Sequence, residues 1–421
     1  MSGSVLIVGC GFPQLSLLRA AKALGLRVVG VDLNARAVGV AVCDEFHRVS
    51  TTDVDAIAAL VTRTKILAIT STGSEASTKT AALVAARLSL PFYAAPETIR
   101  RCQEKDLMRA AYAAAKLRVP EFARCATIAE ARTFAKRNGY PVVVKPSHGW
   151  GQRGVARVDE DEELARAFDD ARAHDARVNG ALEAASVVVE GWLEGREYSV
   201  NGWVERGELV SYCVTERIKV PGKRPLGVMI AELYPSGLSQ AEEASVVDEA
   251  RRGAAALGHT RGPCYSQVAL SGDGLPRLFE TAARLGGGFD ADVTRLASGV
   301  DLYARVLGVA LGSDALETSF ASSPKHPAAI AKFLVARPGL VRQIDGVAAA
   351  RAMPGVADVE CFVAQGDEVY PLTDSAKRAA YVLAHGETRT EVTARATEAL
   401  ATLRIDTDVR DAREPSAEAS T

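Results

Sequence analysis

The amino-acid sequence predicts a multidomain protein that combines an α/β domain with α+β domains. Three observations predict this class. Strand-like and helix-like patterns alternate over residues 1–94, an apolar strand precedes a glycine-rich loop at residues 140–155, and an alternating hairpin spans residues 265–279. With 421 residues, the chain is long enough for about two to four domains with ample core.

The N-terminal pattern predicts a parallel sheet with covering helices. Val5–Val8 is a short apolar run, and the strands expected at 27–32 and 66–70 alternate with helical spacing of leucine and alanine. The turn Gly9-x-Gly11-x-x-Gln14 lacks the third glycine of a dinucleotide-binding fingerprint, although Asp32 falls about where a ribose-binding acid would stand. A tight turn that packs a helix on a strand is therefore favoured over an NAD site.

A small α+β subdomain follows, at about residues 118–192. Asn138-Gly139 has the composition of a helix C-cap, and the proline after Val119 disfavours helix before it. The charged stretch 159–177 predicts a helix with a solvated outer face. The expected helices and strands of this region are 107–116, 127–137, 141–145, 159–177 and 186–190.

A lysine followed by glycines indicates a phosphate-binding element. The apolar run Tyr140-Pro-Val-Val-Val-Lys145 ends in a lysine that can reach the α and β phosphates of a nucleotide. The loop Pro-Ser-His148-Gly149-Trp-Gly151-Gln-Arg-Gly154 supplies backbone N–H groups that can cover the remaining phosphate. No Gly-Lys-Ser/Thr follows, so this is not a Walker A loop. His148 either touches a phosphate or caps the loop.

The predicted hairpin leads into Phe279-Glu280-Thr-Ala-Ala-Arg284-Leu-Gly-Gly287-Gly288. A carboxylate suits a Mg²⁺ ion that carries polyphosphate, and the forked donors of an arginine can hold an oxyanion. The glycines let backbone N–H groups approach a bound phosphate. Together these groups indicate phosphoryl transfer, whereas alone the segment also fits a strand that ends in a glycine-rich turn.

Two apolar strands flank an acidic linker within residues 186–204. Such a linker can bind an adenine edge through its backbone and a ribose through a carboxylate. In the order and spacing of these motifs, residues 1–408 resemble the ATP-grasp superfamily of carboxylate–amine ligases. The resemblance implies an N-terminal domain at 1–94, an ATP-grasp domain at 95–312 with a mobile lid, and a C-terminal α+β domain at 313–408.

The resemblance assigns ATP-binding roles residue by residue. Lys105 matches the lysine that opens the central domain, and Lys145 matches the lysine before the phosphate loop. The expected ATP-binding residues are Lys105, Lys145, His148, Gly149, Gly151, Gly154, the hinge residues Glu190, Trp192 and Leu193, and the ribose-binding Glu197. The implied cofactors are ATP and Mg²⁺, with Mn²⁺ as a substitute.

The metal segment both matches the family and departs from it. Glu280 matches a metal ligand, and Glu-Thr-Ala-Ala-Arg looks most like the L-amino acid ligases that form dipeptides. Many relatives carry an asparagine where this chain has Ala282. The second acidic ligand is expected on the preceding strand, where this chain has the neutral Gln267. Either the site binds metal more weakly, or another carboxylate contributes, or the enzyme is impaired.

The resemblance implies an ATP-dependent ligase that joins a carboxylate to an amine, with an amino acid as one substrate. Arg284 and the N–H groups near Gly287 are the expected catalytic groups, and they would stabilise the oxyanion of the tetrahedral intermediate. The rival interpretations are a purine-pathway ligase, a biotin carboxylase and a catalytically silent nucleotide-binding protein. The expected partners are the small-molecule carboxylate and amine substrates. A homodimer is one possible assembly.

Composition excludes several function classes. The formal net charge is −2 and the isoelectric point is about 6.4, so no basic field argues for nucleic acid or an anionic membrane. Seven scattered cysteines without a Cys-x-x-Cys fit a reducing cytoplasm. The six histidines lack metal-ligand spacing, and no stretch of about 20 apolar residues occurs.

The remaining segments carry weaker signals. Residues 216–225 hold a basic cluster, which is either an exposed loop or a mobile loop that meets the triphosphate or an acidic substrate. Thr72-Gly-Ser-Glu75 either caps a helix or helps to hold the acid. An amphipathic helix is expected at 239–257 and another at 391–403, and the tail 409–421 is expected to be disordered.

Overall fold

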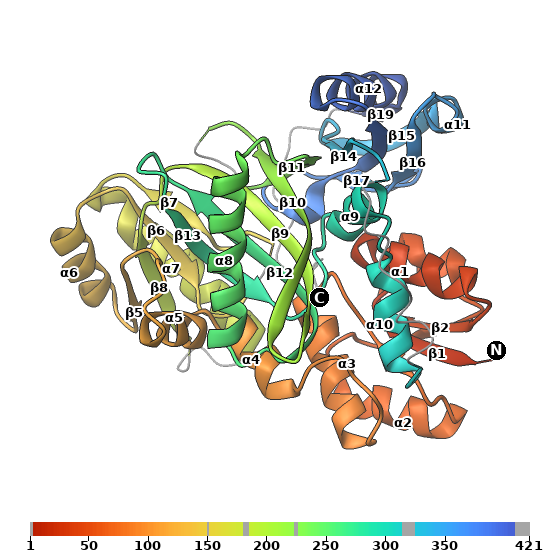
Figure 1. Cartoon of the computed structure of the whole chain (residues 1–421), viewed down its shortest axis with the longest axis horizontal. Coiled ribbons are helices and arrows are strands. Elements are labelled where there is room, and N and C mark those ends of the chain that lie inside the picture. The colour runs from red at the N-terminus through yellow and green to blue at the C-terminus, as the bar shows by residue number, and fades with distance from the viewer. Residues whose placement is uncertain (1–2, 150, 180–184, 223–225, 314–324, 409–421) are drawn as a thin grey trace.

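The computed structural model describes residues 3–149, 151–179, 185–222, 226–313 and 325–408. Its N-terminal part is the expected parallel sheet, in the strand order β3-β2-β1-β4. The elements are β1 (Ser4–Val8), α1 (Phe12–Ala23), β2 (Arg27–Asp32), η1 (Val38–Val42), β3 (Glu45–Arg48), α2 (Val54–Thr64), β4 (Ile69–Thr70) and α3 (Glu75–Arg87). Figure 1 shows this part at one end of the molecule.

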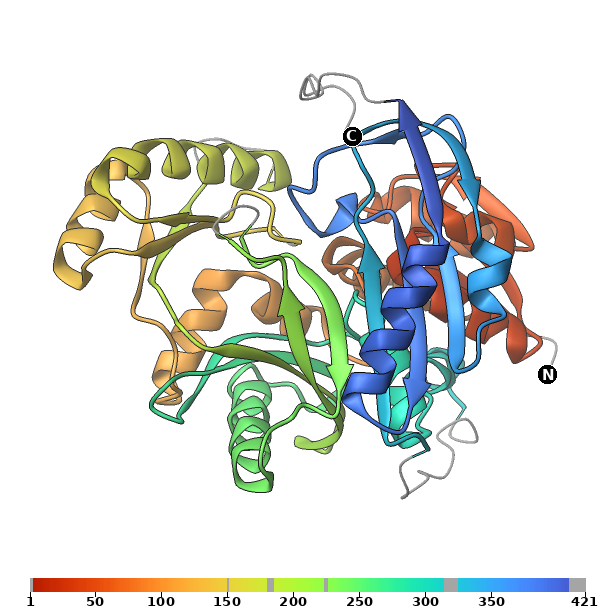
Figure 2. The same ribbon diagram turned by 90° about the horizontal axis from the view of Figure 1, so that it is seen from above.

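Two helices lead into a separate four-stranded sheet with the order β5-β8-β6-β7. These elements are α4 (Pro96–Gln103), α5 (Lys105–Ala114), β5 (Phe122–Cys125), α6 (Ile128–Asn138), β6 (Val142–Pro146), β7 (Ala156–Val158), α7 (Asp161–Asn179) and β8 (Val187–Gly191). The predicted C-cap of α6 is confirmed, since Gly139 ends the helix with φ 81°. Thr127 forms a capping box at the start of the helix. This small subdomain lies at the far end from the N-terminal sheet (Figure 2).

Helix α7 has the predicted solvated outer face, and its opposite face is buried. Leu164 and Phe168 are buried in the core of the small subdomain, because the helix covers its sheet. The carboxylate of Asp175 on the same helix is also buried and accepts hydrogen bonds from the backbone N–H groups of His148 and Ser186. The many charged residues of this helix made its apolar stripe difficult to recognise in the sequence.

An eight-stranded sheet forms the middle of the molecule, with the order β13-β12-β9-β10-β11-β14-β18-β16. Its central elements are β9 (Arg196–Glu205), β10 (Glu208–Lys219), β11 (Met229–Tyr234), α8 (Gln240–Ala256), β12 (Arg261–Leu270), β13 (Pro276–Ala282), α9 (Asp290–Ser298) and α10 (Leu302–Ala310). The predicted hairpin is confirmed as β12 and β13. Helix α8 packs on one face of this sheet through Val246, Ala250 and Leu257.

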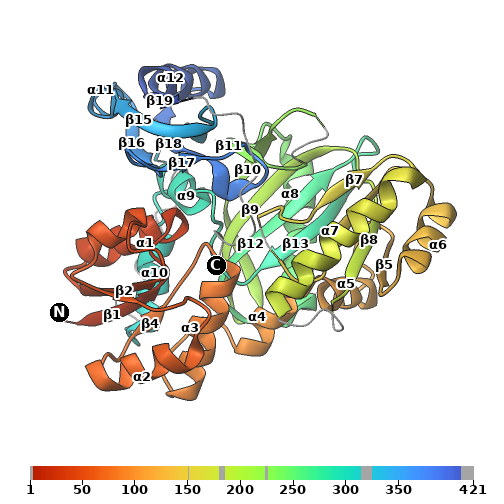
Figure 3. The same ribbon diagram turned by 180° about the vertical axis from the view of Figure 1, so that it is seen from behind.

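Three of the C-terminal strands continue the central sheet, because β14 pairs with β11, and the others form a separate sheet with the order β17-β15-β19. These elements are β14 (Ala328–Leu334), β15 (Gly339–Asp345), α11 (Val347–Arg351), β16 (Val356–Cys361), β17 (Glu368–Val369), η3 (Ser375–Lys377), β18 (Ala380–Gly386), α12 (Arg389–Thr402) and β19 (Arg404–Asp408). Seen from behind, this layer lies on the same side as the N-terminal sheet (Figure 3). The expected domain boundaries stay predictions, and the expected tail at 409–421 lies outside the described residues.

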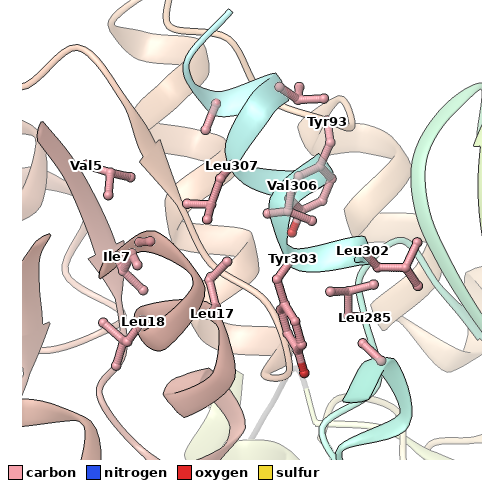
Figure 4. Packing of buried hydrophobic residues seen from close by; sticks show 14 of the residues in the cluster. Val5, Ile7, Leu17, Leu18, Tyr93, Leu285, Leu302, Tyr303, Val306 and Leu307 are labelled. Atoms are coloured by element: carbon pink, nitrogen blue, oxygen red, sulfur yellow. The ribbon is translucent and has the colours of Figure 1, made fainter. Parts of the chain in front are cut away.

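A shared core joins the N-terminal sheet to the segment that follows β13. Figure 4 shows Val306 and Leu307 of α10 packed among Leu17, Tyr93 and Leu285. Leu285 is 2% exposed and directly follows Arg284 in the chain. Burial of a leucine stabilises its position by about 1.5–3 kcal/mol, so the arginine is held at a fixed place beside the N-terminal domain. Within the described residues, no helix is long and apolar enough to cross a membrane.

Candidate active site

One cavity of about 610 Å³ collects side chains from the N-terminal part, the small sheet, the central sheet and the C-terminal part. All of the predicted site residues line it except His148 and Gly154. Those that line it are Lys105, Lys145, Gly149, Gly151, Glu190, Trp192, Leu193, Glu197, Gln267, Glu280, Arg284 and Gly287. The fold thus brings together residues that are up to 182 positions apart, from Lys105 to Gly287.

A buried carboxylate between two cations forms the innermost part of this cavity. Glu190 on β8 accepts from Arg109 Nε at 2.6 Å and lies 2.7 Å from Lys145 Nζ. Burial opposes the charge of Glu190, but Arg109 and Lys145 together lower its pKa to about 2. Burial lowers the pKa of Lys145 to about 8, partly offset by Glu190. Two cations against one anion leave a net positive charge, which suits a phosphate chain.

Lys105 lies at the first turn of α5 and reaches the predicted phosphate loop. Its Nζ donates to the carbonyl oxygen of Gly149 at 2.6 Å, and burial lowers its pKa. Gly149 and Gly151 have φ values of 146° and 71°, a backbone conformation that favours glycine. The loop also touches the C-terminal part, since Ser375 N–H donates to Gly151 O at 3.3 Å.

The expected nucleotide roles of His148 and Gly154 stay predictions. His148 does not line the cavity, and its Nδ1 lies 3.1 Å from the Asp175 carboxylate of α7. A Cβ added at Gly154 would lie 3.0 Å from the Cβ of His174. The sequence placed both residues in the loop but did not give their orientation.

Residues of the expected adenine hinge and ribose site contact basic side chains of the protein. The guanidinium of Arg157 lies 4.3 Å from the Trp192 ring centroid and fixes that side chain at the cavity wall. Glu197 pairs with Lys219 and lies 3.7 Å from Arg217 Nε. Lys219, from the basic cluster of the sequence, also lines the cavity. Lys223 and Arg224 of that cluster lie outside the described residues.

Glu280 and Gln267 face each other as cross-strand partners on β13 and β12. Gln267 Nε2 donates to Tyr265 Oη at 3.1 Å, which leaves the amide oxygen available for another contact. Within the described residues, no group of three His, Cys, Asp or Glu side chains could hold a metal by itself. One carboxylate and one amide fit a Mg²⁺ ion that takes its other oxygens from phosphates and water.

Arg284 is held by a residue of the N-terminal domain that the sequence assigned only weakly. Its Nε and Nη2 donate to Glu75 Oε1 at 2.9 and 2.5 Å, and its Nη1 donates to Leu285 O at 2.9 Å. These bonds use three of the five N–H donors of the guanidinium, so up to two can serve an oxyanion. Ser74 makes no side-chain cap of α3, which corrects the capping interpretation.

The glycines after Arg284 are required by packing. A Cβ on Gly287 would overlap the carbonyl oxygen of Gly73, and a Cβ on Gly286 would overlap the Asp290 carboxylate. The N–H of Gly288 donates to Asp290 Oδ2 at 3.1 Å, so that donor is already used. An oxyanion-binding role for the Gly287 N–H stays a prediction. The motifs did not reveal Arg378, which lines the cavity, or Arg109 and Asp290, which contact Glu190 and Gly288.

Known families and proteins match separate parts of the chain. The ATP-grasp domain family matches residues 138–292, and the L-amino acid ligase C-terminal domain 2 family matches residues 332–408. An uncharacterised protein of Sinorhizobium fredii, y4rH, is 30% identical over 350 residues, which cover 82% of this chain and 70% of the relative. The carbamoyl phosphate synthase large chain of Beutenbergia cavernae is 31% identical over 181 residues, 43% of this chain and only 16% of that protein.

Solved structures share the fold at low sequence identity. The L-amino acid ligase from Bacillus licheniformis superposes with a TM-score of 0.79 at 20% identity, over 97% of this chain and 99% of that one. Phosphoribosylglycinamide synthetase from Anaerococcus prevotii gives 0.74 at 16%, over 97% and 100%. Biotin carboxylase from Campylobacter jejuni gives 0.76 at 20%, over 96% and 92%.

The chain therefore carries an ATP-grasp domain over residues 138–292, and its fold is that of the ATP-grasp ligases to which it is similar. Its C-terminal part carries the domain of the L-amino acid ligases. The expected ATP-grasp fold is confirmed, including the parallel N-terminal sheet.

Proposed function

We propose that the protein is an ATP-dependent ligase that joins a carboxylic acid to the amine of an amino acid, with release of ADP and phosphate. One observation carries this proposal. Lys145 from the phosphate-loop motif lines the same cavity as Glu280 and Arg284 from the hairpin motif. A group that binds phosphate, a group that holds a metal and a group that stabilises an oxyanion are thus within reach of one pair of reactants.

The chemistry proceeds in two steps. A carboxylate oxygen of the acid attacks the γ-phosphorus of ATP, the bond to the β,γ-bridging oxygen breaks, and an acyl phosphate and ADP form. The amine nitrogen then attacks the acyl carbon, the C–O bond to phosphate breaks, and the nitrogen loses a proton to solvent. Mg²⁺, held by Glu280 and Gln267, neutralises phosphate charge when it is bound.

The chain's own residues bind and orient these reactants. Lys105 and Lys145 hold phosphate oxygens, and the backbone of Gly149 and Gly151 covers them. Up to two remaining donors of Arg284 can bind the charge that develops on the acyl oxygen, a contribution whose loss typically costs about 100- to 1000-fold in rate. Glu75 holds the guanidinium in place, because its Oε1 accepts hydrogen bonds from both Nε and Nη2 of Arg284.

A second candidate is a nucleotide-binding protein without turnover. The neutral Gln267 beside Glu280 favours it, since the pair brings one negative charge where the family expects two. A purine-pathway ligase and a biotin-carboxylase-like enzyme are the enzymatic rivals, and the carboxylase reaction would require bicarbonate and biotin.

The deciding experiment is a screen of ADP release over pairs of amino acids and small carboxylic acids, with mass spectrometry of the products. We expect ADP and an amide in equal amounts for at least one pair. ADP release that requires bicarbonate and biotin would replace the proposal with the carboxylase. ATP binding without ADP release across the panel would support the silent protein.

A further inference from the structure

We propose that Arg378, from the C-terminal part of the chain, binds a second substrate carboxylate, the one that is not phosphorylated. The inference rests on the proposed function and deepens it, because it defines the amine substrate as an amino acid with a free carboxylate. Arg378 lies directly after η3, is 4% exposed and lines the cavity of about 610 Å³.

Arg378 is unusual among the buried arginines of the described residues. Five arginines are buried in that part of the chain, and four of them pair with a carboxylate of the protein. These pairs are Arg109 with Glu190, Arg217 with Glu232, Arg284 with Glu75 and Arg305 with Glu205. Among the described residues, no carboxylate lies within ion-pair distance of Arg378. A buried cation without an anion is costly unless a ligand supplies the anion.

The environment of Arg378 holds its guanidinium in place without satisfying it. Nε donates to Ser375 O at 2.7 Å and Nη1 lies 3.4 Å from Met229 O, so up to three N–H donors remain for a ligand. The guanidinium lies 3.8 Å from the Phe333 ring centroid and 5.3 Å from that of Phe12. Aromatic faces leave the edge of the fork open, which is the part that receives a carboxylate in bidentate geometry.

Arg378 lies close to the segment that follows Arg284. Met229, whose carbonyl contacts Arg378, also meets Gly288, where an added Cβ would overlap the methionine side chain. Gly288 follows Arg284 by four residues, and Arg284, Gly288 and Arg378 all line the same cavity. A substrate whose amine reaches the acyl carbon beside Arg284 can therefore extend its own carboxylate toward Arg378.

The electrostatics agree with this geometry. Burial lowers the pKa of Arg378 to about 10, and the nearby Asp290 offsets only part of the effect. Asp290 Oδ1 is itself buried without a hydrogen-bond partner. A bound substrate carboxylate would stabilise the charged form of Arg378 and so offset the effect of burial.

The test compares substrates that differ only in that carboxylate. ADP release is measured for L-amino acids and for their C-terminal amides, with wild type, Arg378→Gln and Arg378→Lys. We expect Arg378→Gln to raise the KM for the amino acid about 10- to 100-fold, as for a lost charged hydrogen bond. The KM for the amide and for ATP should stay unchanged, and Arg378→Lys should fall between. Wild type alone should already prefer the acid over the amide.

Arg305→Gln is the matched control, because Arg305 is equally buried, stacks 4.3 Å from the Trp203 ring centroid and lies outside the cavity. It should leave all three KM values unchanged. Equal losses for acids and amides in Arg378→Gln would overturn the inference. A loss confined to dicarboxylic acid substrates, compared with their monoamides, would assign the carboxylate to the acid instead of the amine.

Calorimetry separates this inference from the proposed function. If no pair releases ADP, the proposed function fails, and binding of amino acids and amides is then titrated in the presence of MgADP. Binding of the amino acid to wild type but not to Arg378→Gln would still support the carboxylate site. No binding of any carboxylate to wild type would overturn it.

Discussion

The buried position of Lys145 predicts that ATP binding weakens as the pH rises through about 8. Burial lowers the pKa of this lysine to about 8, and a phosphate chain beside it would raise that pKa again in the complex. Raising the pH removes the charge from the free protein first, so affinity falls. Between about pH 7 and about pH 9 the protonated fraction of the free lysine drops about tenfold, and the association constant should drop about tenfold with it.

Isothermal titration with MgATP at constant ionic strength measures this slope. Lys145→Arg is the matched variant, because an arginine keeps its charge over the whole range and should bind ATP without the slope. Lys145→Ala should bind weakly at every pH. Lys105 remains in all three proteins, so any slope left in Lys145→Arg belongs to another group. A wild-type affinity that is constant over this range, or a slope that persists unchanged in Lys145→Arg, would refute the reasoning.

Three further predictions concern the metal and acyl ends of the site. Arg284→Ala should lower turnover by about 100- to 1000-fold with ATP affinity nearly constant. It should also lower the melting temperature, because Glu75 loses its partner. Normal turnover would remove the arginine from the mechanism. Glu280→Gln should abolish turnover, whereas Gln267→Glu should keep it and lower the Mg²⁺ concentration at half-maximal rate in a metal titration; an inactive Gln267→Glu would show that the amide has a specific role. Gly287→Ala should cost about 1–3 kcal/mol of stability in denaturant titration, because its Cβ would meet a backbone carbonyl, and an unchanged midpoint would contradict that packing.

Local patterns predicted those parts of the site that depend on neighbours in the chain. Lys145 ends a strand and precedes glycines, and the hairpin that carries Gln267 and Glu280 has a clear turn between two alternating runs. Cross-strand pairing follows from such a hairpin, so the two metal-site residues could be expected to face each other. The parallel N-terminal sheet was also predictable from a local pattern, because strand-like and helix-like runs alternate over residues 1–94.

Partners that come from distant segments could not be predicted. Glu75 lies 209 residues from Arg284, and Arg109 lies 81 residues from Glu190. The pairing of β14 with β11 brings the C-terminal segment that holds Arg378 to the cavity. The sequence of neither strand indicates this pairing. Orientation within a loop was also out of reach, because residues 148–154 lack a regular period that would separate His148 from its neighbours.

The most direct test of the account follows one oxygen atom. An acid identified in the ADP-release screen is labelled with ¹⁸O in its carboxylate and incubated with ATP and the amine, and the released phosphate is analysed by mass spectrometry. If the acid is activated as an acyl phosphate, each turnover transfers one ¹⁸O atom from the acid to inorganic phosphate, in step with amide formation. Phosphate that carries no label while the amide forms would contradict the central claim.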